Sequence, residues 1–414
     1  MRVNTKRLWD DLEQLGVIGR HPEDGSVTRI AFSPEDMQGR EFLKGLMHSA
    51  GLEVEQDAFG NIIGRLRGCH DMPAIAVGSH IDTVPRGGRF DGSLGVLAGL
   101  ECARIFKESD YPLRRPLEII SFSDEEGFKF GRGTLGSRAM SGFLNPDDLN
   151  ILKDRDGQTL RQVLIELGFQ SDHLTPRYKT PRLFSYVELH IEQGPVLESL
   201  NLPIGIVEVI VGILRFQLRF EGEANHAGTT PMAYRKDALT VAASIVTALR
   251  DLVLKHQEEM VGTVGRFEVW PGASNIIPGS VLMTIELRGP RLVALEEVAN
   301  EILHFAHHQS DQTGVSCAAN ETARIEPTLM NRQVTDVIET ACHNAGVSYR
   351  RMNSGAGHDA IWMARICPAG MLFVPSSGGN SHNSKEDTSE YHVELGTQVL
   401  LQTILELDRK EPLE

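Results

Sequence analysis

A histidine and two aspartates follow an apolar run near the start of the chain, at a spacing that suits metal binding. The run PAIAVGS ends at Ser79, and His80, Asp82 and Asp91 come after it in GSHIDTVPRGGRFDG. His80 offers an imidazole nitrogen and Asp91 two carboxylate oxygens, while the carboxylate of Asp82 can orient the imidazole by accepting its other N–H. Taken singly, each residue is also typical of a capped turn or a polar loop.

Two further apolar runs end in the same kinds of side chain. LEIISFS is followed by the adjacent carboxylates Glu125 and Glu126, SYVELHI contains His190, and His382 comes after a GGNS segment. Adjacent carboxylates repel each other, so beside a buried strand they need a cation or a shared proton, whereas at an exposed turn they need neither. Sites in open α/β sheets lie at the carboxyl ends of the strands, where all of these residues would meet.

The predicted cluster offers nitrogen and oxygen ligands, which suit Zn²⁺ or Mn²⁺, with Co²⁺ and Ni²⁺ as alternatives. The ligands outnumber the three that a single catalytic ion takes from the protein, which indicates two divalent ions per subunit bridged by a carboxylate. The five cysteines are scattered and form no C-x-x-C pair, which argues against a thiolate zinc site or a disulfide framework.

The elements that must position this cluster follow from the order of the patterns along the chain. Apolar runs alternate with helical patterns such as the one from Ser93, which favours a mostly parallel sheet covered by helices on both faces. Residues 212–326 differ, because their strand-helix-strand-strand-helix-strand order is the ferredoxin-like pattern. We therefore predict an α/β metal-binding catalytic domain made of residues 1–211 and 327–414, interrupted by an inserted ferredoxin-like α+β dimerisation or lid domain.

Length and charge limit the classes of protein to which the chain can belong. The 414 residues suggest two or three domains, and 41 Lys and Arg against 56 Asp and Glu give a formal net charge of −15. Such an acidic balance opposes non-specific attraction to nucleic acid or to an anionic membrane. Because neither a membrane-spanning run nor the apolar region of a signal peptide is present, we expect a cytoplasmic protein.

Six separated motifs resemble the amidase/hydantoinase/carbamoylase branch of the binuclear zinc peptidase and aminoacylase superfamily. They are, in order, GSHIDTVPRGGRFDG, SDEEG, ELHIEQGPVLE, GEANHAGTTPM, SNIIPGSV, and SGAGHDA followed by SHN. The resemblance implies five metal ligands, with His80 and His190 on one ion, Glu126 and His382 on the other, and Asp91 between them.

The same resemblance implies three catalytic residues. Glu125 would be the general acid/base, and Asp82 the partner of the His80 ring. His226, in EANHAGTTP, would donate a hydrogen bond to the oxyanion that forms during hydrolysis. In relatives this histidine comes from the neighbouring subunit, which implies a homodimer.

Five further residues resemble family positions that bind the substrate. Asn275 and Arg288 are similar to a pair that binds the α-carboxylate, and an arginine can do so with a bidentate fork. Gln193 and the Gly357-His358 turn are similar to positions that contact the ureido and carboxylate groups. The implied substrate is a small anionic carbamoyl or ureido acid.

We therefore expect hydrolysis of an N-carbamoyl-L-amino acid to the L-amino acid, ammonia and carbon dioxide. FKFGRGTLGSRAMSG, after the glutamate pair, resembles carbamoylases more than allantoate enzymes. Allantoate amidohydrolase shares all the metal and base residues and is the first alternative; β-ureidopropionase and ureidoglycolate hydrolysis also stay open. A non-catalytic metal- or ligand-binding relative is the alternative from a different class, and the presence of Glu125 argues against it.

Overall fold

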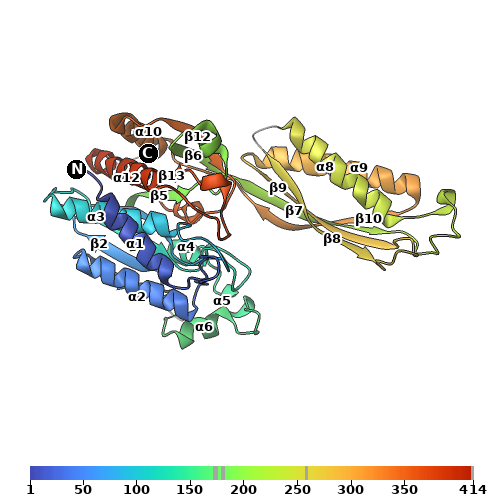
Figure 1. Cartoon of the computed structure of the whole chain (residues 1–414), viewed down its shortest axis with the longest axis horizontal. Helices are drawn as coiled ribbons and strands as arrows, with labels where there is room; N and C mark the ends of the chain where they lie inside the picture. Colours follow the sequence, from blue (N-terminus) through green and yellow to red (C-terminus); the bar gives the residue numbers. More distant parts are fainter. Residues whose placement is uncertain (171–175, 179–181, 257–259, 412–414) are drawn as a thin grey trace. The chain divides into compact units, whose positions relative to one another are not determined.

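The computed structural model describes residues 1–170, 176–178, 182–256 and 260–411 and separates into two compact units (Figure 1). Unit one consists of Met1–Glu208 and Leu329–Glu414, and unit two of Val209–Thr328. Each unit has its own apolar core. Among the helices of the described ranges, none combines the length and the apolar character needed to cross a membrane.

Unit one is built on a large sheet whose centre is parallel. The strand order is β1-β2-β4-β3-β5-β13-β6-β11, with β12 paired to β6. The strands are β1 (Glu53–Gln56), β2 (Ile62–Leu66), β3 (Ala74–His80), β4 (Leu117–Phe122), β5 (Leu183–Ile191), β6 (Ile204–Ile210), β11 (Thr328–Leu329), β12 (Tyr349–Ser354) and β13 (Ala369–Val374). The four central strands β4, β3, β5 and β13 run parallel, which confirms the predicted mostly parallel sheet, while β2 and β6 flank them in antiparallel pairing.

The central strands read as continuous apolar runs because both of their faces are covered. Every residue of β3, β4, β5 and β13 is buried. The helices of unit one are α1 (Thr5–Val17), α2 (Pro34–Ser49), α3 (Ser93–Glu108), α4 (Leu135–Ser141), α5 (Asp148–Ile151), α6 (Leu160–Glu166), α7 (Val196–Leu200), α10 (Arg332–Ala345), α11 (Ala360–Met363) and α12 (Glu390–Arg409), with a 3-10 turn at Ser377–Gly379.

Helix α3 is the element that brings the Asp91 loop to the sheet. It packs on β3, β4 and β5, and its residues Ser93–Phe106 are buried. Gly95 permits this close approach, because a Cβ atom at that position would lie 2.4 Å from the backbone oxygen of Leu189 in β5. The loop that ends at Gly92, the N-cap of α3, is thereby held against the carboxyl ends of β3 and β5.

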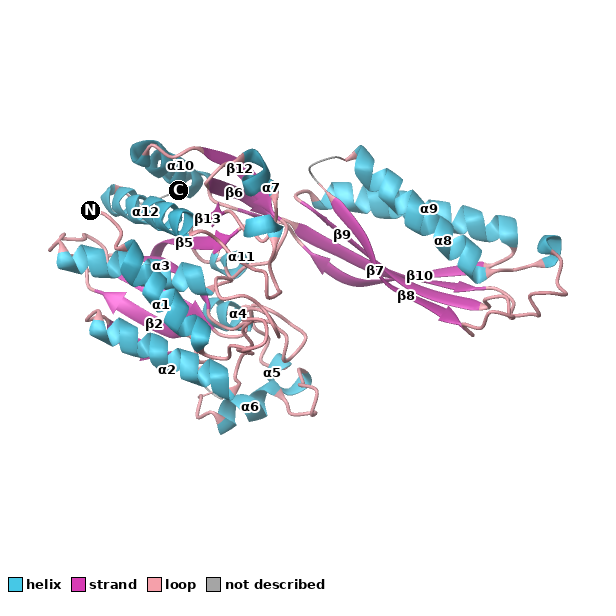
Figure 2. Cartoon of the chain, viewed as in Figure 1, coloured by secondary structure: helices cyan, strands magenta, loops and turns pink. Residues whose placement is uncertain are grey.

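Unit two is a four-stranded antiparallel sheet with two helices on one face (Figure 2). Its elements are β7 (Gly212–Glu221), a 3-10 turn (Met232–Tyr234), α8 (Ala238–Lys255), β8 (Val261–Trp270), β9 (Ser280–Gly289), α9 (Leu292–Thr313) and β10 (Ser316–Ile325). The strand order β10-β7-β9-β8 is that of a ferredoxin-like sheet. Burial alternates along β7 and β9, because every second side chain packs under α8 and α9.

Candidate metal centre and active site

The carboxyl ends of the parallel strands bring together the five residues predicted as metal ligands. His80 is the last residue of β3 and His190 lies one residue before the end of β5, while Glu126 follows β4. Asp91 precedes α3, and His382 lies in the loop between β13 and α12. Parallel strands end at the same edge of a sheet, which explains why side chains so distant in sequence meet there.

Asp91 lies between two sets of ligand atoms. Its Oδ1 is 3.1 Å from Nε2 of His190 and 3.7 Å from Nε2 of His80, whereas its Oδ2 is 3.2 Å from Nε2 of His382. Oε2 of Glu126 lies 3.4 Å from the same His382 nitrogen. The two sets, His80-Asp91-His190 and Asp91-Glu126-His382, each have the spacing of a metal site.

The chemistry of these donors fits divalent cations. All the ligand atoms are nitrogen or oxygen, the donors preferred by ions such as Zn²⁺ and Mn²⁺. Oε1 of Glu126 is buried and has no hydrogen-bond partner among the described residues. A buried carboxylate oxygen without a donor is costly, and a bound cation would compensate it.

Backbone carbonyls orient both histidines of the first set. Nδ1 of His190 lies 2.9 Å from the carbonyl oxygen of Ile191, and Nδ1 of His80 lies 3.0 Å from that of Asp82. A carbonyl only accepts, so each Nδ1 carries its proton and each Nε2 faces Asp91. Asp82 is thus the hydrogen-bond partner of His80 through its backbone carbonyl, whereas its carboxylate, the group that we expected to accept the bond, lies 3.7 Å from Nδ1.

The carboxylate of Asp82 instead holds the turn that carries the two glutamates. It accepts the backbone N–H of Glu125 at 3.3 Å and that of Glu126 at 3.2 Å. This is possible because Asp124 adopts a left-handed backbone conformation, with φ of 55°, directly after β4. Oε2 of Glu125 consequently lies 3.6 Å from Nε2 of His80, at the edge of the ligand cluster.

The buried carboxylates perturb one another's ionisation. Burial, followed by the charge of Asp359, raises the pKa of Glu125 well above its usual range, and burial, followed by the charge of Asp91, does the same for Glu126. Burial opposes ionisation of Asp91 too, but hydrogen bonds from His190 and His382 outweigh it and hold its pKa well below the usual range. Burial disfavours protonation of His190, yet the hydrogen bond to Asp91 outweighs it and raises the pKa of His190 to about 9.

Two of the predicted substrate residues also lie in the cluster. Nε2 of Gln193 donates to Oδ2 of Asp91 at 2.8 Å, and Oε1 of Gln193 is buried without a hydrogen-bond partner among the described residues. His358, next to Gly357, is buried, with its ring centroid 4.6 Å from that of His190 and its Nε2 2.9 Å from Oγ of Ser354. Burial, followed by the charge of His190, lowers the pKa of His358 well below its ordinary value, so its ring is neutral.

The sequence analysis missed two buried glutamates that support the cluster. Glu188 in β5 accepts hydrogen bonds from Oγ of Ser79, the hydroxyl of Tyr186 and the backbone N–H of Ala360. Glu386 accepts the backbone N–H of Asp91, and burial, followed by the charge of Asp91, raises the pKa of Glu386 to about 7. An acidic residue inside the apolar run SYVELHI was a signal for Glu188, whereas Glu386 stands in the polar run SKEDT and gave none.

Two residues predicted to act on the substrate lie together in unit two. His226 forms a β-bridge with Ile276, and the backbone N–H of Ala227 donates to the carbonyl oxygen of Asn275 at 2.9 Å. Nδ1 of the exposed His226 accepts the backbone N–H of Gly228 at 3.0 Å. Because Nδ1 accepts, the neutral ring carries its proton on Nε2 and presents a donor there.

Arg288 does not lie with that pair. Asn275 precedes the Ser280 end of β9, whereas Arg288 lies at the other end, opposite Ile213 in β7. Eight residues of strand separate Ser280 from Arg288, which amounts to about 26 Å at about 3.3 Å per residue. Nε of Arg288 is 2.7 Å from Oε1 of Glu286. Asn275 and Arg288 of one chain therefore cannot contact the same small molecule, and their predicted action as a pair requires two copies of the chain.

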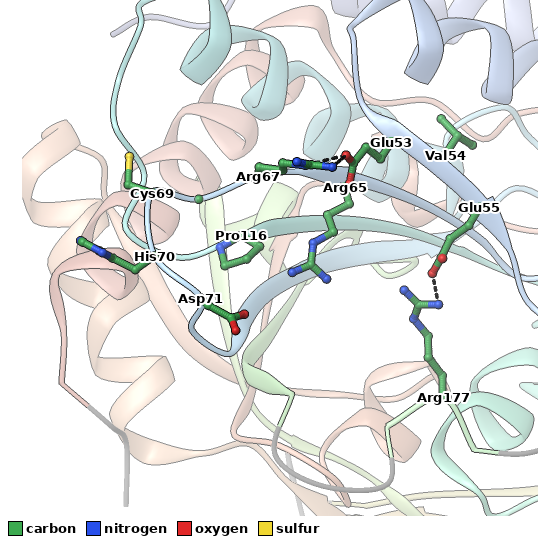
Figure 3. Close-up of a pocket in the computed structure, with 11 residues that line it drawn as sticks. Glu53, Val54, Glu55, Arg65, Arg67, Cys69, His70, Asp71, Pro116 and Arg177 are labelled. Atoms are coloured by element: carbon green, nitrogen blue, oxygen red, sulfur yellow. Dashed lines mark hydrogen bonds and ion pairs between the residues drawn. The ribbon is translucent and has the colours of Figure 1, made fainter.

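A polar cavity of about 650 Å³ is lined by residues outside this cluster, which Figure 3 shows as sticks. It adjoins Asp71 and Pro116, which precede the amino ends of β3 and β4, whereas the ligand cluster lies at the carboxyl ends. Its arginines are paired with carboxylates, as Arg67 is with Glu53 and Arg177 with Glu55. The cavity therefore offers little net positive charge to an anionic substrate, and we do not place the active site there.

Comparisons with known proteins agree with the ligand cluster. Residues 76–406 match the model of peptidase family M20/M25/M40. An N-carbamoyl-L-amino-acid amidohydrolase of Paenarthrobacter aurescens is 39% identical over 410 residues, covering 99% of each chain, and an allantoate amidohydrolase of Bacillus subtilis is 38% identical, covering 97% of each. A crystal structure of a hydantoinase/carbamoylase family amidase from Burkholderia multivorans superposes with a TM-score of 0.94 at 34% identity, covering 100% of this chain and 99% of that one. These matches confirm the resemblance stated from the motifs.

Proposed function

The chain belongs to peptidase family M20/M25/M40 and is an amidohydrolase, and we propose that it hydrolyses an N-carbamoyl-L-amino acid to the L-amino acid, ammonia and carbon dioxide. The observation that carries this proposal is the position of Asp91 between two sets of metal ligands, with Glu125 at their edge. The carbamoyl relative, aligned over nearly the whole chain, supports the choice of substrate.

The two ligand sets would hold two divalent ions, Zn²⁺ or Mn²⁺. His80 and His190 would bind one ion and Glu126 and His382 the other, and Asp91 would be a ligand of both. When bound, such ions polarise the carbonyl of the substrate and lower the pKa of water. The surplus of buried carboxylates favours this occupancy, because Oε1 of Glu126 has no hydrogen-bond partner among the described residues and burial, followed by the charge of Asp91, raises the pKa of its carboxyl group.

Glu125 moves the proton. It accepts a proton from the attacking water and returns it to the nitrogen that leaves, so that one C–N bond breaks and ammonia departs as a neutral molecule. The N-carboxy amino acid that remains then loses carbon dioxide to give the L-amino acid. A base that must return its proton needs a pKa closer to neutrality than that of an exposed glutamate, and burial shifts the pKa of Glu125 in this direction. Asp82 is a positioning residue here, because it holds the backbone of Glu125 in place.

Five further predicted residues would hold the substrate. Gln193 accepts a ureido N–H with Oε1, the atom that has no partner among the described residues, while its Nε2 stays on Asp91. Gly357 and His358 form the adjacent wall, since the His358 ring packs on that of His190. Arg288 and Asn275 bind the α-carboxylate, and His226 donates from Nε2 to the oxyanion.

The separation along β9 supports a homodimer with shared sites. Arg288 cannot touch the same small molecule as His226 and Asn275 of its own chain, because about 26 Å of strand lies between them. If all three contact one substrate, His226 and Asn275 come from one copy and Arg288 from the other. We assign Arg288 to the subunit that supplies Glu125, and His226 and Asn275 to its partner.

A second candidate function is hydrolysis of allantoate, favoured by the 38% identity to the Bacillus subtilis enzyme. The test is ammonia release from N-carbamoyl-L-methionine and from allantoate, with chelator and after addition of Mn²⁺ or Zn²⁺. We expect metal-dependent turnover of the carbamoyl acid, with a higher kcat/KM than for allantoate, and its loss in Glu125→Gln. A higher kcat/KM for allantoate would favour the second function, and no turnover of either by metal-loaded protein would contradict both.

A further inference from the structure

We propose that Glu386 is a positioning residue that locks Asp91 and the His382 loop into one arrangement and thereby sets the metal affinity of the site. The inference rests on the proposed function in that Asp91 and His382 are taken as metal ligands. It concerns a residue that has no ligand atom in either set and that contacts them only through hydrogen bonds.

The carboxylate of Glu386 joins two segments that are almost 300 residues apart in sequence. Its Oε1 accepts the backbone N–H of Phe90 and that of Asp91, each at 3.0 Å. Its Oε2 lies 3.1 Å from Oγ of Ser381, the residue before His382. The same serine hydroxyl lies 3.0 Å from Oδ2 of Asp91. Ser381 therefore contacts the carboxylates of both Glu386 and Asp91.

Glu386 itself is fixed on its own side of the contact. Its backbone N–H donates to the carbonyl oxygen of Asn383 at 3.1 Å, and Nδ2 of Asn383 donates to the carbonyl oxygen of Ser381 at 2.8 Å. These hydrogen bonds tie the turn that carries His382 to Glu386. A shift of the Glu386 carboxylate would displace both the backbone of Asp91 and the residue next to His382.

The loop that contains Gly88 leaves room for the Glu386 carboxylate. Gly88 faces it so closely that a Cβ atom at position 88 would lie 2.0 Å from Oε1 of Glu386. Glu386 is buried, with 6% of its surface exposed. A buried carboxylate that satisfies two main-chain donors restricts the loop far more than an exposed ion pair does, because water cannot replace those hydrogen bonds.

The experiment compares the metal affinity of chelator-stripped Glu386→Ala, Glu386→Gln and wild-type protein, by calorimetric titration with Mn²⁺. Groups that orient a ligand typically change metal affinity by about 10- to 100-fold, and we expect a loss of that size for Glu386→Ala. Glutamine keeps an oxygen that accepts both N–H groups, so we expect Glu386→Gln to stay within about threefold of wild type. Glu390→Gln is the matched control, because Glu390 is exposed and begins the next helix.

Each outcome decides the inference. Wild-type affinity in Glu386→Ala would overturn it, and so would an equal loss in both variants, since that would assign the effect to charge rather than to hydrogen-bond geometry. If Glu386→Ala does not fold without metal, as judged by its thermal transition, Glu386→Asp withdraws the carboxylate by one methylene and must itself lower Mn²⁺ affinity by at least about threefold. If wild-type protein binds Mn²⁺ but hydrolyses no ureido acid, the proposed function fails while the affinity comparison still tests Glu386.

Discussion

Mixed dimers offer a direct test of the shared active site. One chain carries Glu125→Gln and the other His226→Ala, each with a different affinity tag, and the two are expressed together. Each variant alone should be nearly inactive: loss of a general base costs about 10²- to 10⁴-fold and loss of an oxyanion donor about 10²- to 10³-fold. Mixing should restore activity, because the subunit with an intact Glu125 receives an intact His226 from its partner.

The size of the recovery follows from the geometry. With equal amounts and random pairing, half of the dimers are mixed and each has one intact site of two, so about a quarter of wild-type activity should return. A second mixture, Glu125→Gln with Arg288→Ala, should stay at background, because we place Arg288 in the same subunit as Glu125. His226 lies near the Ser280 end of β9 through its β-bridge with Ile276, whereas Arg288 lies at the other end, and those ends are about 26 Å apart.

The assay is ammonia release from N-carbamoyl-L-methionine, measured on protein that has passed both affinity columns so that only mixed dimers remain. Purified mixed dimers should then reach about half of wild-type activity per dimer. Background activity in the His226 mixture would refute sharing of His226 between subunits. Recovery in the Arg288 mixture would refute the assignment of Arg288 to the Glu125 subunit.

Three further predictions follow from the cluster and its supports. His190 must lose a proton to bind a metal ion, and the pKa of its ring is about 9. The affinity for Mn²⁺, measured by calorimetry, should therefore rise with pH up to about 9 and then level off. An affinity that does not change between pH 7 and 9 would contradict this prediction. Asp82→Ala should lower kcat by about 10- to 100-fold, because it removes the acceptor of the Glu125 backbone N–H, whereas Asp71→Asn at the remote cavity should leave kcat unchanged. Equal kcat values for the two variants would show that the turn keeps its conformation without Asp82. Gly95→Ala should destabilise the protein by about 1–3 kcal/mol in urea unfolding, whereas Gly45→Ala, at an exposed position of α2 with open space around it, should not. Equal stabilities of the two variants would mean that α3 can move away from β5 at no cost.

The sequence predicted which residues gather at the site because the relevant signal is local. Each of β3, β4 and β5 is a continuous apolar run that ends in or beside a ligand, and the carboxyl ends of neighbouring parallel strands necessarily meet. The apolar runs did not predict that β2 and β6 pair antiparallel with the central strands, because short strands of the same composition pair in either direction.

The structure departs from the sequence-based expectations where contacts between side chains depend on the conformation of one residue or on the length of a strand. The left-handed turn at Asp124 directs two N–H groups at the carboxylate of Asp82, and a non-glycine residue gives little warning of such a turn. Likewise, the motifs containing Asn275 and Arg288 are close in sequence, yet the strand between them carries them to opposite ends of the sheet. Spacing in sequence predicts proximity within a turn or a helix, whereas a strand converts the same spacing into distance.

Asp91 shows why naming the ligands does not determine the properties of the centre. One of its oxygens faces His190 and His80, which stand on strands whose positions the sheet determines. The other faces His382, on a loop whose place depends on hydrogen bonds to Glu386, and no periodicity or motif in the sequence marks that carboxylate. Glu386 also holds the backbone of Asp91, which belongs to both ligand sets, so its loss should weaken both halves of the site, and the half built on His382 more strongly. In Glu386→Ala we accordingly expect two separable Mn²⁺ affinities in the titration, both below the wild-type value and one weakened further; an equal loss at both sites would contradict this division of the centre.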